Sequence, residues 1–140
     1  MKTDNLRTSP DVYPLSGIRI IDGDTIEANI VLPFGQESRK RIRLRDWWAP
    51  ELEGRFRSAG LDAKYALEIW LQDKDVWLLC PQQRTDKYGR VVGALWHLGA
   101  IVNPQMVIGH HQMTSEAHKA MSDEIREGHK QARQWPNDKA

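Results

Sequence analysis

The 140-residue sequence predicts one α+β domain, mainly β, in which five strands form a barrel and three helices pack on it. Three observations predict this fold. Segments before residue 47 are rich in β-branched residues or alternate between polar and apolar residues, as strands do. One central segment has the apolar spacing of a helix, and two later segments begin with helix caps. No repeat or Gly/Ser-rich linker divides the chain, whose length suits a single domain.

Three strands are expected in the first third of the chain. Ser16–Asp22 and Thr25–Leu32 are rich in β-branched residues, and Gly23-Asp24 between them is a hairpin signal. Residues 39–46 alternate, with arginines at the odd positions and two apolar residues at even ones. These are Arg39, Arg41, Arg43 and Arg45, against Ile42 and Leu44. Because strand side chains alternate faces, the arginines should share one face and the apolar pair the other.

A helix and two further strands should follow Pro50. The apolar stripe of the helix has the spacing i, i+3, i+4, i+7, i+8. Its members are Ala63, Ala66, Leu67, Trp70 and Leu71, with Ser58 near the start. Val76–Cys80 and Val91–His97 are the expected fourth and fifth strands.

Two helices are expected to end the chain. Asn103-Pro104 opens a short helix that Gly109 closes, and a longer helix runs from Thr114 or Ser115 to about Arg133, where Pro136 stops it. The resulting order of strands and helices fits a small Greek-key barrel of the OB type. We expect the domain to span residues 13–136, with a flexible N-terminal arm at 1–12 and a tail at 137–140.

Composition excludes several classes of protein. The longest apolar runs are far shorter than the ~20 residues that span a bilayer, and the N-terminus lacks the apolar region of a signal peptide. The single cysteine, Cys80, cannot form an internal disulfide, which favours a reducing compartment. The formal charge of +1 means that any basic footprint for nucleic acid must be local. We therefore expect a cytoplasmic monomer with no membrane partner.

Four short clusters stand in a distinctive order. They are Ile21-Asp22-Gly23-Asp24-Thr25, Ile42-Arg43-Leu44, Ala49-Pro50-Glu51 and Asp86-Lys87-Tyr88-Gly89-Arg90. In this order and at these separations they resemble the staphylococcal nuclease (thermonuclease) family. The resemblance extends from about Gly17 to Trp135 and so covers nearly the whole chain. Any one cluster is a weak signal, but the joint pattern is specific.

The resemblance implies a five-stranded OB barrel that hydrolyses DNA or RNA phosphodiesters with a Ca²⁺ ion, as an endonuclease of low sequence specificity. Carried over by position, Arg43 and Arg90 resemble the two catalytic arginines, and Glu51 resembles the proposed general base. Asp24 resembles the first metal carboxylate, and the carbonyl of Ala49 could also bind the metal. Lys87 and Tyr88 resemble the pair that contacts a substrate phosphate. The implied partner is nucleic acid, as single-stranded DNA, RNA or both.

These residue types suit that chemistry. Phosphodiester hydrolysis gathers negative charge on the oxygens around phosphorus, so preorganised cations lower the barrier. The planar arginine fork meets two phosphate oxygens and stays charged at any working pH. A carboxylate can orient or deprotonate the attacking water. Ca²⁺ prefers several oxygen ligands and would polarise a phosphoryl oxygen.

One departure from the family pattern concerns the metal. Trp48 stands where the family carries a second metal-binding aspartate, three residues before the glutamate. Asp46 lies two residues earlier and, on a regular strand, shares a face with Trp48. Asp22 shares a face with Asp24 by the same argument. We hypothesise that Asp46 or Asp22 replaces the missing ligand.

Other interpretations remain open. Trp48 makes a second class of protein credible, a nucleic-acid-binding OB module that has lost catalysis; a protein-interaction barrel is a third. Taken alone, the arginine run is a solvated strand face, and Arg39, Arg41 and Arg45 are expected at the surface or steering phosphate. The five histidines lack the spacing of a zinc site, since the chain has no HExxH or H-x3-H pattern.

Overall fold

The computed structural model describes residues 12–81 and 85–139 and shows an α+β protein built on a closed, five-stranded mixed β-barrel with three helices. The strands are β1 (Val12–Asp22), β2 (Thr25–Val31), β3 (Glu37–Leu44), β4 (Trp77–Leu79) and β5 (Val91–His97), with a short β6 (Ala100–Ile101) beside β5. The helices are α2 (Arg57–Leu71), α3 (Gln105–Ile108) and α4 (Ser115–Lys139). Short 3-10 turns are η1 (Pro33–Gly35), η2 (Gly54–Phe56) and η3 (Gly109–His111). The predicted fold class is confirmed, and the barrel is compatible with an OB fold.

One parallel pairing closes the barrel. The antiparallel order β3-β2-β1-β4-β5 leaves β3 and β5 at its ends, and these two strands pair in parallel. In that register Arg43 lies opposite Val92, and Arg90 directly precedes β5. The closure therefore brings to the same part of the barrel two arginines that lie 47 positions apart in the printed sequence (90 − 43).

Apolar side chains from the strands and α2 fill the barrel. Ile26, Ile42, Leu67 and Leu95 are each 0% exposed, and Leu78 is 1% exposed. Full burial of a side chain of this size contributes about 1.5–3 kcal/mol. The expected alternation of β3 is confirmed, because Ile42 and Leu44 are buried while the arginines beside them are not.

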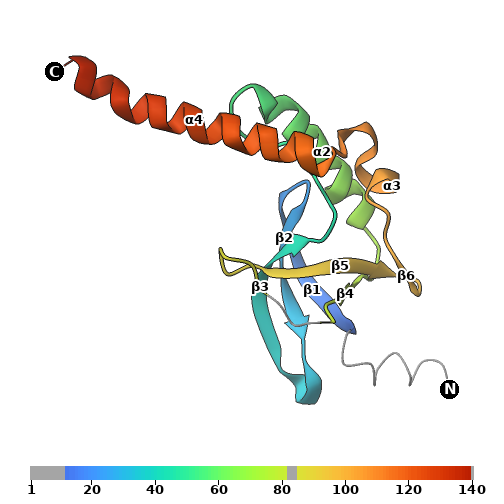
Figure 1. Ribbon diagram of the computed structural model, residues 1–140. Helices are drawn as coiled ribbons and strands as arrows, with labels where there is room; N and C mark the ends of the chain where they lie inside the picture. Colours follow the sequence, from blue (N-terminus) through green and yellow to red (C-terminus); the bar gives the residue numbers. More distant parts are fainter. Residues whose placement is uncertain (1–11, 82–84, 140) are drawn as a thin grey trace.

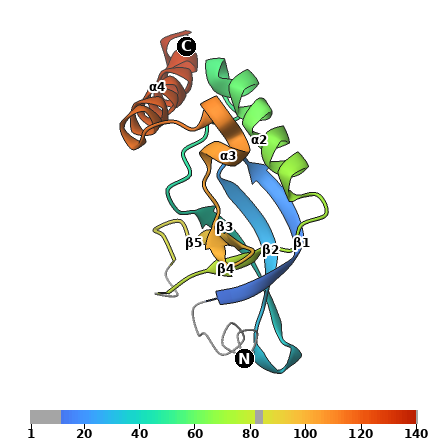
Figure 2. The same ribbon diagram turned by 90° about the vertical axis from the view of Figure 1, so that its right-hand side faces the viewer.

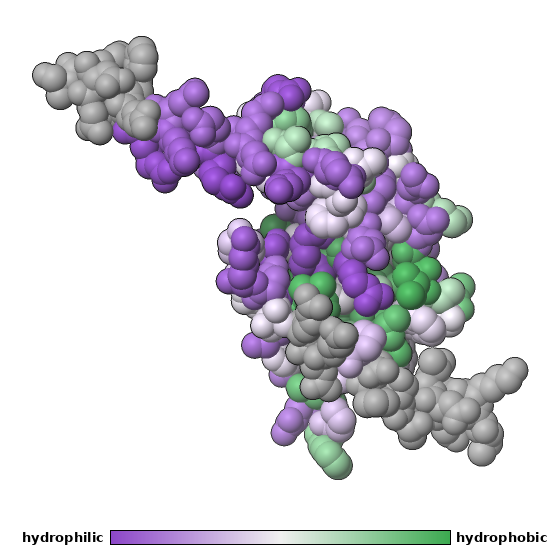
Figure 3. Space-filling view, viewed as in Figure 1, coloured by the Kyte–Doolittle hydropathy of each residue, from purple (hydrophilic) through white to green (hydrophobic). Residues whose placement is uncertain are grey.

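The three helices gather at one end of the barrel, and α4 runs out beyond it (Figures 1 and 2). Asn103 caps α3 by accepting the backbone N–H of Gln105 at 2.9 Å, and Thr114 caps α4 through the N–H of Ala117 at 3.1 Å. The outer surface of α4 is mainly hydrophilic (Figure 3). Among the described residues, no helix has both the length and the apolar character to cross a bilayer.

Several expected boundaries differ from those observed. Val12, expected in the N-terminal arm, is the first residue of β1, because its 9%-exposed side chain packs in the barrel opposite Leu79. Residues 1–11 of that arm lie outside the described residues. Pro136 does not stop the last helix, and residues 137–139, expected as a tail, lie in α4. That end of α4 projects away from the barrel (Figure 1), so a carbonyl that loses its donor at Pro136 can be hydrated.

Gly23 is required by a close approach between the β1–β2 turn and its neighbours. A Cβ at this position would lie 2.7 Å from the Cβ of Ala49 and 2.8 Å from that of Ala63 in α2. Real Cβ atoms essentially never come this close. The absence of a side chain at Gly23 thus lets α2 press against the turn that carries Asp24.

We predict that Gly23→Ala lowers the free energy of unfolding by about 1–3 kcal/mol, because neither contact is with a flexible side chain. Gly128→Ala is the control, since nothing lies within 4 Å of a Cβ there and Ala favours a helix by about 1 kcal/mol. Denaturant unfolding of both variants measures the difference. A Gly23→Ala protein as stable as the wild type would show that this packing is loose.

Candidate active site

A cavity of about 540 Å³ is bounded by the β1–β2 turn, the end of β3 with the loop that follows it, the turn before β5, and α4. It is lined by Asp22, Asp24, Arg41, Arg43, Trp48, Glu51, Tyr88, Arg90, His118, Ser122 and Arg126. Five of the residues expected at the site from the sequence therefore line one cavity. These five are Asp24, Arg43, Glu51, Tyr88 and Arg90, and Asp22, which was named as an alternative ligand, lines the cavity as well.

Asp24 is the most enclosed charged group of the cavity, with 4% of its surface exposed. Its Oδ2 accepts the backbone N–H of Ala49 at 2.9 Å, and its Oδ1 accepts the hydroxyl of Thr25 at 3.1 Å. Two further groups approach Oδ2, the Nη2 of Arg43 at 3.7 Å and the Nε2 of His118 at 3.5 Å. The turn, the loop after β3, β3 itself and α4 thus meet at one carboxylate.

The two aspartates of the β1–β2 turn have opposite electrostatic environments. Burial favours the neutral form of Asp24, but the close contact with His118 and the charge of Arg43 outweigh it and lower the pKa of this carboxyl. Burial and the charge of Asp24 raise the pKa of Asp22 well above its ordinary 3.8. The Oδ1 of Asp22 still accepts the backbone N–H of Asp24 at 3.0 Å. The pair therefore favours one charged and one neutral carboxyl at neutral pH.

Arg43 is held rigidly at the end of β3. Its Nη1 donates to the backbone carbonyl of Leu44 at 2.5 Å and to that of Asp24 at 3.4 Å. The guanidinium lies over the ring of Trp48, 4.8 Å from the ring centroid. These contacts preorganise the cation with only 13% of its side chain exposed.

Arg90 is positioned by the tight turn that precedes β5. The carboxylate of Asp86 accepts the N–H groups of Tyr88 and Arg90 with Oδ1, each at 2.9 Å, and the Nε of Arg90 with Oδ2 at 2.7 Å. Gly89 gives this turn a φ of +81°. Among the described residues, no hydrogen bond or ion pair uses the two Nη groups of Arg90, which remain free to bind an anion.

Glu51 is held at its backbone and partly exposed at its carboxylate. Its N–H donates to the sulfur of Met121 in α4 at 3.4 Å, and α2 presses against its carbonyl at Gly60, where a Cβ would lie 2.5 Å from that oxygen. Burial and the charge of Asp24 raise the pKa of Glu51 above its ordinary 4.5, although His118 acts in the opposite direction. A carboxylate with a raised pKa and 37% exposure is a stronger base than an ordinary glutamate and is open to water.

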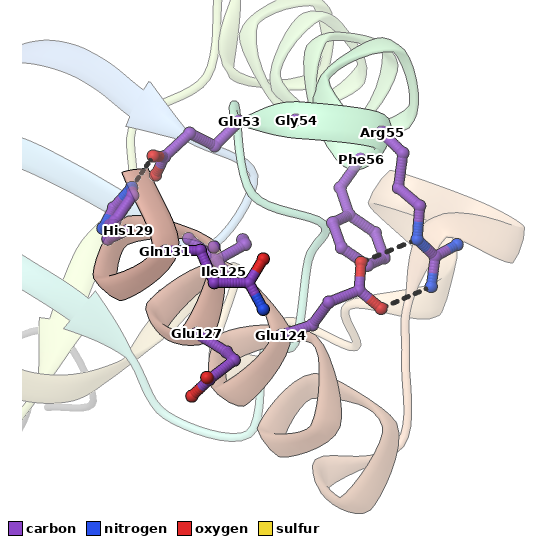
Figure 4. A pocket seen from close by; sticks show the side chains of 10 residues that line it. Glu53, Gly54, Arg55, Phe56, Glu124, Ile125, Glu127, His129 and Gln131 are labelled. Carbon is purple, nitrogen blue, oxygen red and sulfur yellow. Dashed lines mark hydrogen bonds and ion pairs between the residues drawn. The ribbon is translucent and has the colours of Figure 1, made fainter. Parts of the chain in front are cut away.

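Contacts at successive turns tie the loop after β3 to α4. Figure 4 shows Arg55 beside Glu124, to which it donates two hydrogen bonds of 2.7 and 2.9 Å. It also shows Glu53 facing His129, with a hydrogen bond between their side chains. These residues line a second cavity of about 500 Å³ beside η2. The contacts hold α4 along the loop that carries Trp48 and Glu51, and so help to keep α4 over the candidate site.

Three other residues expected at the site do not line this cavity. Lys87 is exposed and lines an adjoining cavity, which shares Trp48, His118, Ser122 and Arg126 with the first. Ala49 is buried and contributes its N–H to Asp24. Asp46 is exposed with φ +67° and does not line the cavity, because β3 ends at Leu44 and the alternation that would have aligned Asp46 with Trp48 ends there.

Sequence reasoning missed the contribution of α4. His118, Ser122 and Arg126 are spaced four residues apart, so they share one face of the helix, and all three line the cavity. This spacing was visible in the sequence. The side of the barrel that α4 would cover was not, because it depends on contacts distant along the chain.

The residues present do not fit the Ca²⁺ ion that the motifs imply. Within residues 12–81 and 85–139, no group of three or more His, Cys, Asp or Glu side chains is arranged to hold a metal. Ca²⁺ takes about six to eight oxygen ligands. The Oδ2 of Asp24 accepts the N–H of Ala49 and is also approached by Arg43 and His118, and Trp48 supplies no ligand. No step of the chemistry below is therefore derived through a metal.

Comparison of the sequence with protein-family models and with curated proteins finds no match. The fold and the geometry of this cavity are accordingly the grounds on which a function is proposed.

We predict that Asp22→Asn stabilises the protein increasingly as the pH rises. A carboxyl whose pKa is higher in the folded state favours folding fully below its unfolded pKa of 3.8 and loses that contribution at higher pH. Asn cannot ionise and keeps an oxygen for the N–H of Asp24. The gain in unfolding free energy should be near zero around pH 4 and reach about 1 kcal/mol or more by pH 8.

Denaturant unfolding across this pH range measures the effect, with Asp62→Asn, an exposed change on α2, as control. A gain for Asp22→Asn that does not vary with pH would contradict the raised pKa of Asp22.

Proposed function

We propose that the protein is a phosphodiesterase that hydrolyses single-stranded DNA, RNA or both, in the manner of the staphylococcal nuclease family that its motifs resemble. The observation that carries this proposal is that Arg43, Arg90 and Glu51 line one cavity although they come from three separate segments. Two guanidiniums and a carboxylate that line one cavity of about 540 Å³ supply the groups that such a reaction needs.

The two arginines supply the positive charge. As water approaches phosphorus, negative charge grows on the surrounding oxygens, and fixed guanidiniums stabilise that charge without reorganising. Arg43 is immobilised by backbone carbonyls and Trp48, and Arg90 by Asp86. The two Nη groups of Arg90, which no hydrogen bond or ion pair of the described residues uses, suit a two-point contact with phosphate.

Glu51 supplies the base. In the proposed reaction the water oxygen bonds to phosphorus, one P–O ester bond breaks, and the carboxylate accepts the proton that the water loses. The departing oxygen takes a proton from solvent. The raised pKa of Glu51 favours this role near neutral pH.

The rim of the cavity favours a flexible, negatively charged strand. Arg41 and Arg126 also line the cavity, and Lys87 lies in the adjoining one. The ring of Tyr88 is exposed, with Lys87 and Arg90 each near its face. Cations of this kind address the phosphate backbone, which carries no base identity, so we expect low sequence specificity.

Trp48 favours one alternative function, a barrel that binds nucleic acid without cleaving it. Single-turnover digestion of labelled single-stranded DNA and RNA separates the two. Reactions with Ca²⁺ and with EDTA are run in parallel, so that the outcome does not depend on a metal requirement. Cleavage in either buffer supports the enzyme, whereas binding that weakens with salt and no cleavage supports the binding module.

We predict that Arg43→Ala and Arg90→Ala each lower the turnover rate by about 100-fold or more, because each guanidinium acts mainly on charge that develops in the transition state. The control is Arg45→Ala, an exposed arginine that follows β3 and does not line the cavity. Rapid-quench measurement of single turnovers gives the rates. Equal losses in all three variants would point to a general effect of charge instead.

We predict that Glu51→Gln lowers kcat/KM by about 100-fold and removes the acid limb of its pH profile. In the wild type, activity should fall as the pH drops through the raised pKa of Glu51, because the protonated carboxyl cannot accept a proton. Gln has the same shape and does not titrate. An unchanged acid limb in the Gln variant would assign the base to another group.

A further inference from the structure

Two residues outside the family-like motifs meet at the centre of the candidate site. The ring of His118 lies against that of Trp48, with centroids 5.1 Å apart and planes inclined by 54°. The guanidinium of Arg43 lies over the same ring, 4.8 Å from its centroid. Trp48, which stands where a metal-binding carboxylate is expected, therefore packs against both His118 and Arg43.

The Nε2 atom of His118 points at both key carboxylates. It lies 3.5 Å from the Oδ2 of Asp24 and 3.9 Å from the Oε1 of Glu51. The atom is buried and makes no hydrogen bond within the described part of the chain. Leaving a buried polar atom unsatisfied costs about 1–3 kcal/mol, so a folded site that keeps one needs a reason for it.

Asp24 and Glu51 need a compensating group between them. Two carboxylates in one partly buried space repel each other, and nuclease-like sites resolve this with a divalent cation. Here the Oδ2 of Asp24 is approached by nitrogen instead, from Arg43 at 3.7 Å and from His118 at 3.5 Å. Nε2 carries an N–H in the imidazolium and in one neutral tautomer, and in those forms His118 presents a donor to the carboxylates.

We propose that His118 and Arg43 together take the place of a divalent cation, so that the site hydrolyses phosphodiesters with no bound metal. This inference rests on the proposed function. Arg43 holds Asp24 and contacts the phosphate, while His118 is a positioning residue, which acts through Asp24 and Glu51. In this proposal its ring nitrogen, 3.5 Å from Asp24 and 3.9 Å from Glu51, offsets the repulsion between the two carboxylates and so holds them in place.

The experiment has a binding arm and a kinetic arm, both on the full chain. Calorimetric titration with Ca²⁺, and separately with Mn²⁺, should show no saturable binding to the wild type at millimolar metal. Cleavage of single-stranded DNA or RNA by the wild type should stay within about twofold on adding EDTA. Saturable metal binding, or cleavage that EDTA abolishes and added metal restores, would overturn the inference.

Variants of His118 separate a positioning role from a merely structural one. His118→Gln should lower kcat by roughly tenfold or more with little change in KM, as the loss of a group that orients another does. His110→Gln, an exposed histidine outside the cavity, is the matched control and should leave both constants unchanged. Wild-type kcat in His118→Gln, with its fold verified by circular dichroism, would contradict the role.

His118→Asp provides a second, opposite test. A carboxylate in place of the imidazole adds an oxygen ligand beside Asp24 and Glu51, so the variant should bind Ca²⁺ and cleave only when it is present. A variant that stays metal-independent and fully active would overturn the proposal. If no protein cleaves in either buffer, the proposed function fails, and the wild-type titrations alone then decide whether the site takes a metal.

Discussion

The buried carboxylate of Asp24 joins four parts of the chain at one point. It lies in the turn between β1 and β2, accepts the N–H of Ala49, and is approached by Arg43 from β3 and His118 from α4. A buried charge without partners is very costly, so none of these segments can move away from it alone. Most other groups of the cavity lie on one of the segments that this carboxylate joins, whereas Tyr88 and Arg90 are brought there by the pairing of β5 with β3.

Two close approaches at glycines hold the same segments together. At Gly23 the turn meets the loop after β3 and α2, and at Gly60 the helix meets the carbonyl of Glu51. The result is a local charge pattern that the net charge of +1 conceals, since four arginines and three acids line one cavity. Cations and acids held this close by packing form a preorganised polar site, in which little must rearrange when an anion binds.

Much of this architecture was predictable from local pattern. The alternation around Ile42 correctly identified the buried face of β3, and the stripe of α2 and the cap at Asn103 identified two helices. The predictions that were wrong concern the ends of elements. Val12 extends β1 because it pairs with a neighbouring strand, and Pro136 does not end α4, which projects away from the barrel there. Local sequence does not contain that information.

The sequence by itself determined the elements and the chemical types at the site: two arginines, a glutamate and an aspartate pair at family-like separations. The tertiary structure alone decided that Trp48 and His118 meet and that Asp46 lies outside the cavity. It also decided that nitrogen groups of Arg43 and His118 approach Asp24, where a metal ion held by oxygen ligands was expected. The physical reason is that α4 and β3 are far apart in the chain, and only the closing of the barrel and the packing of α4 on the loop after β3 bring their side chains together.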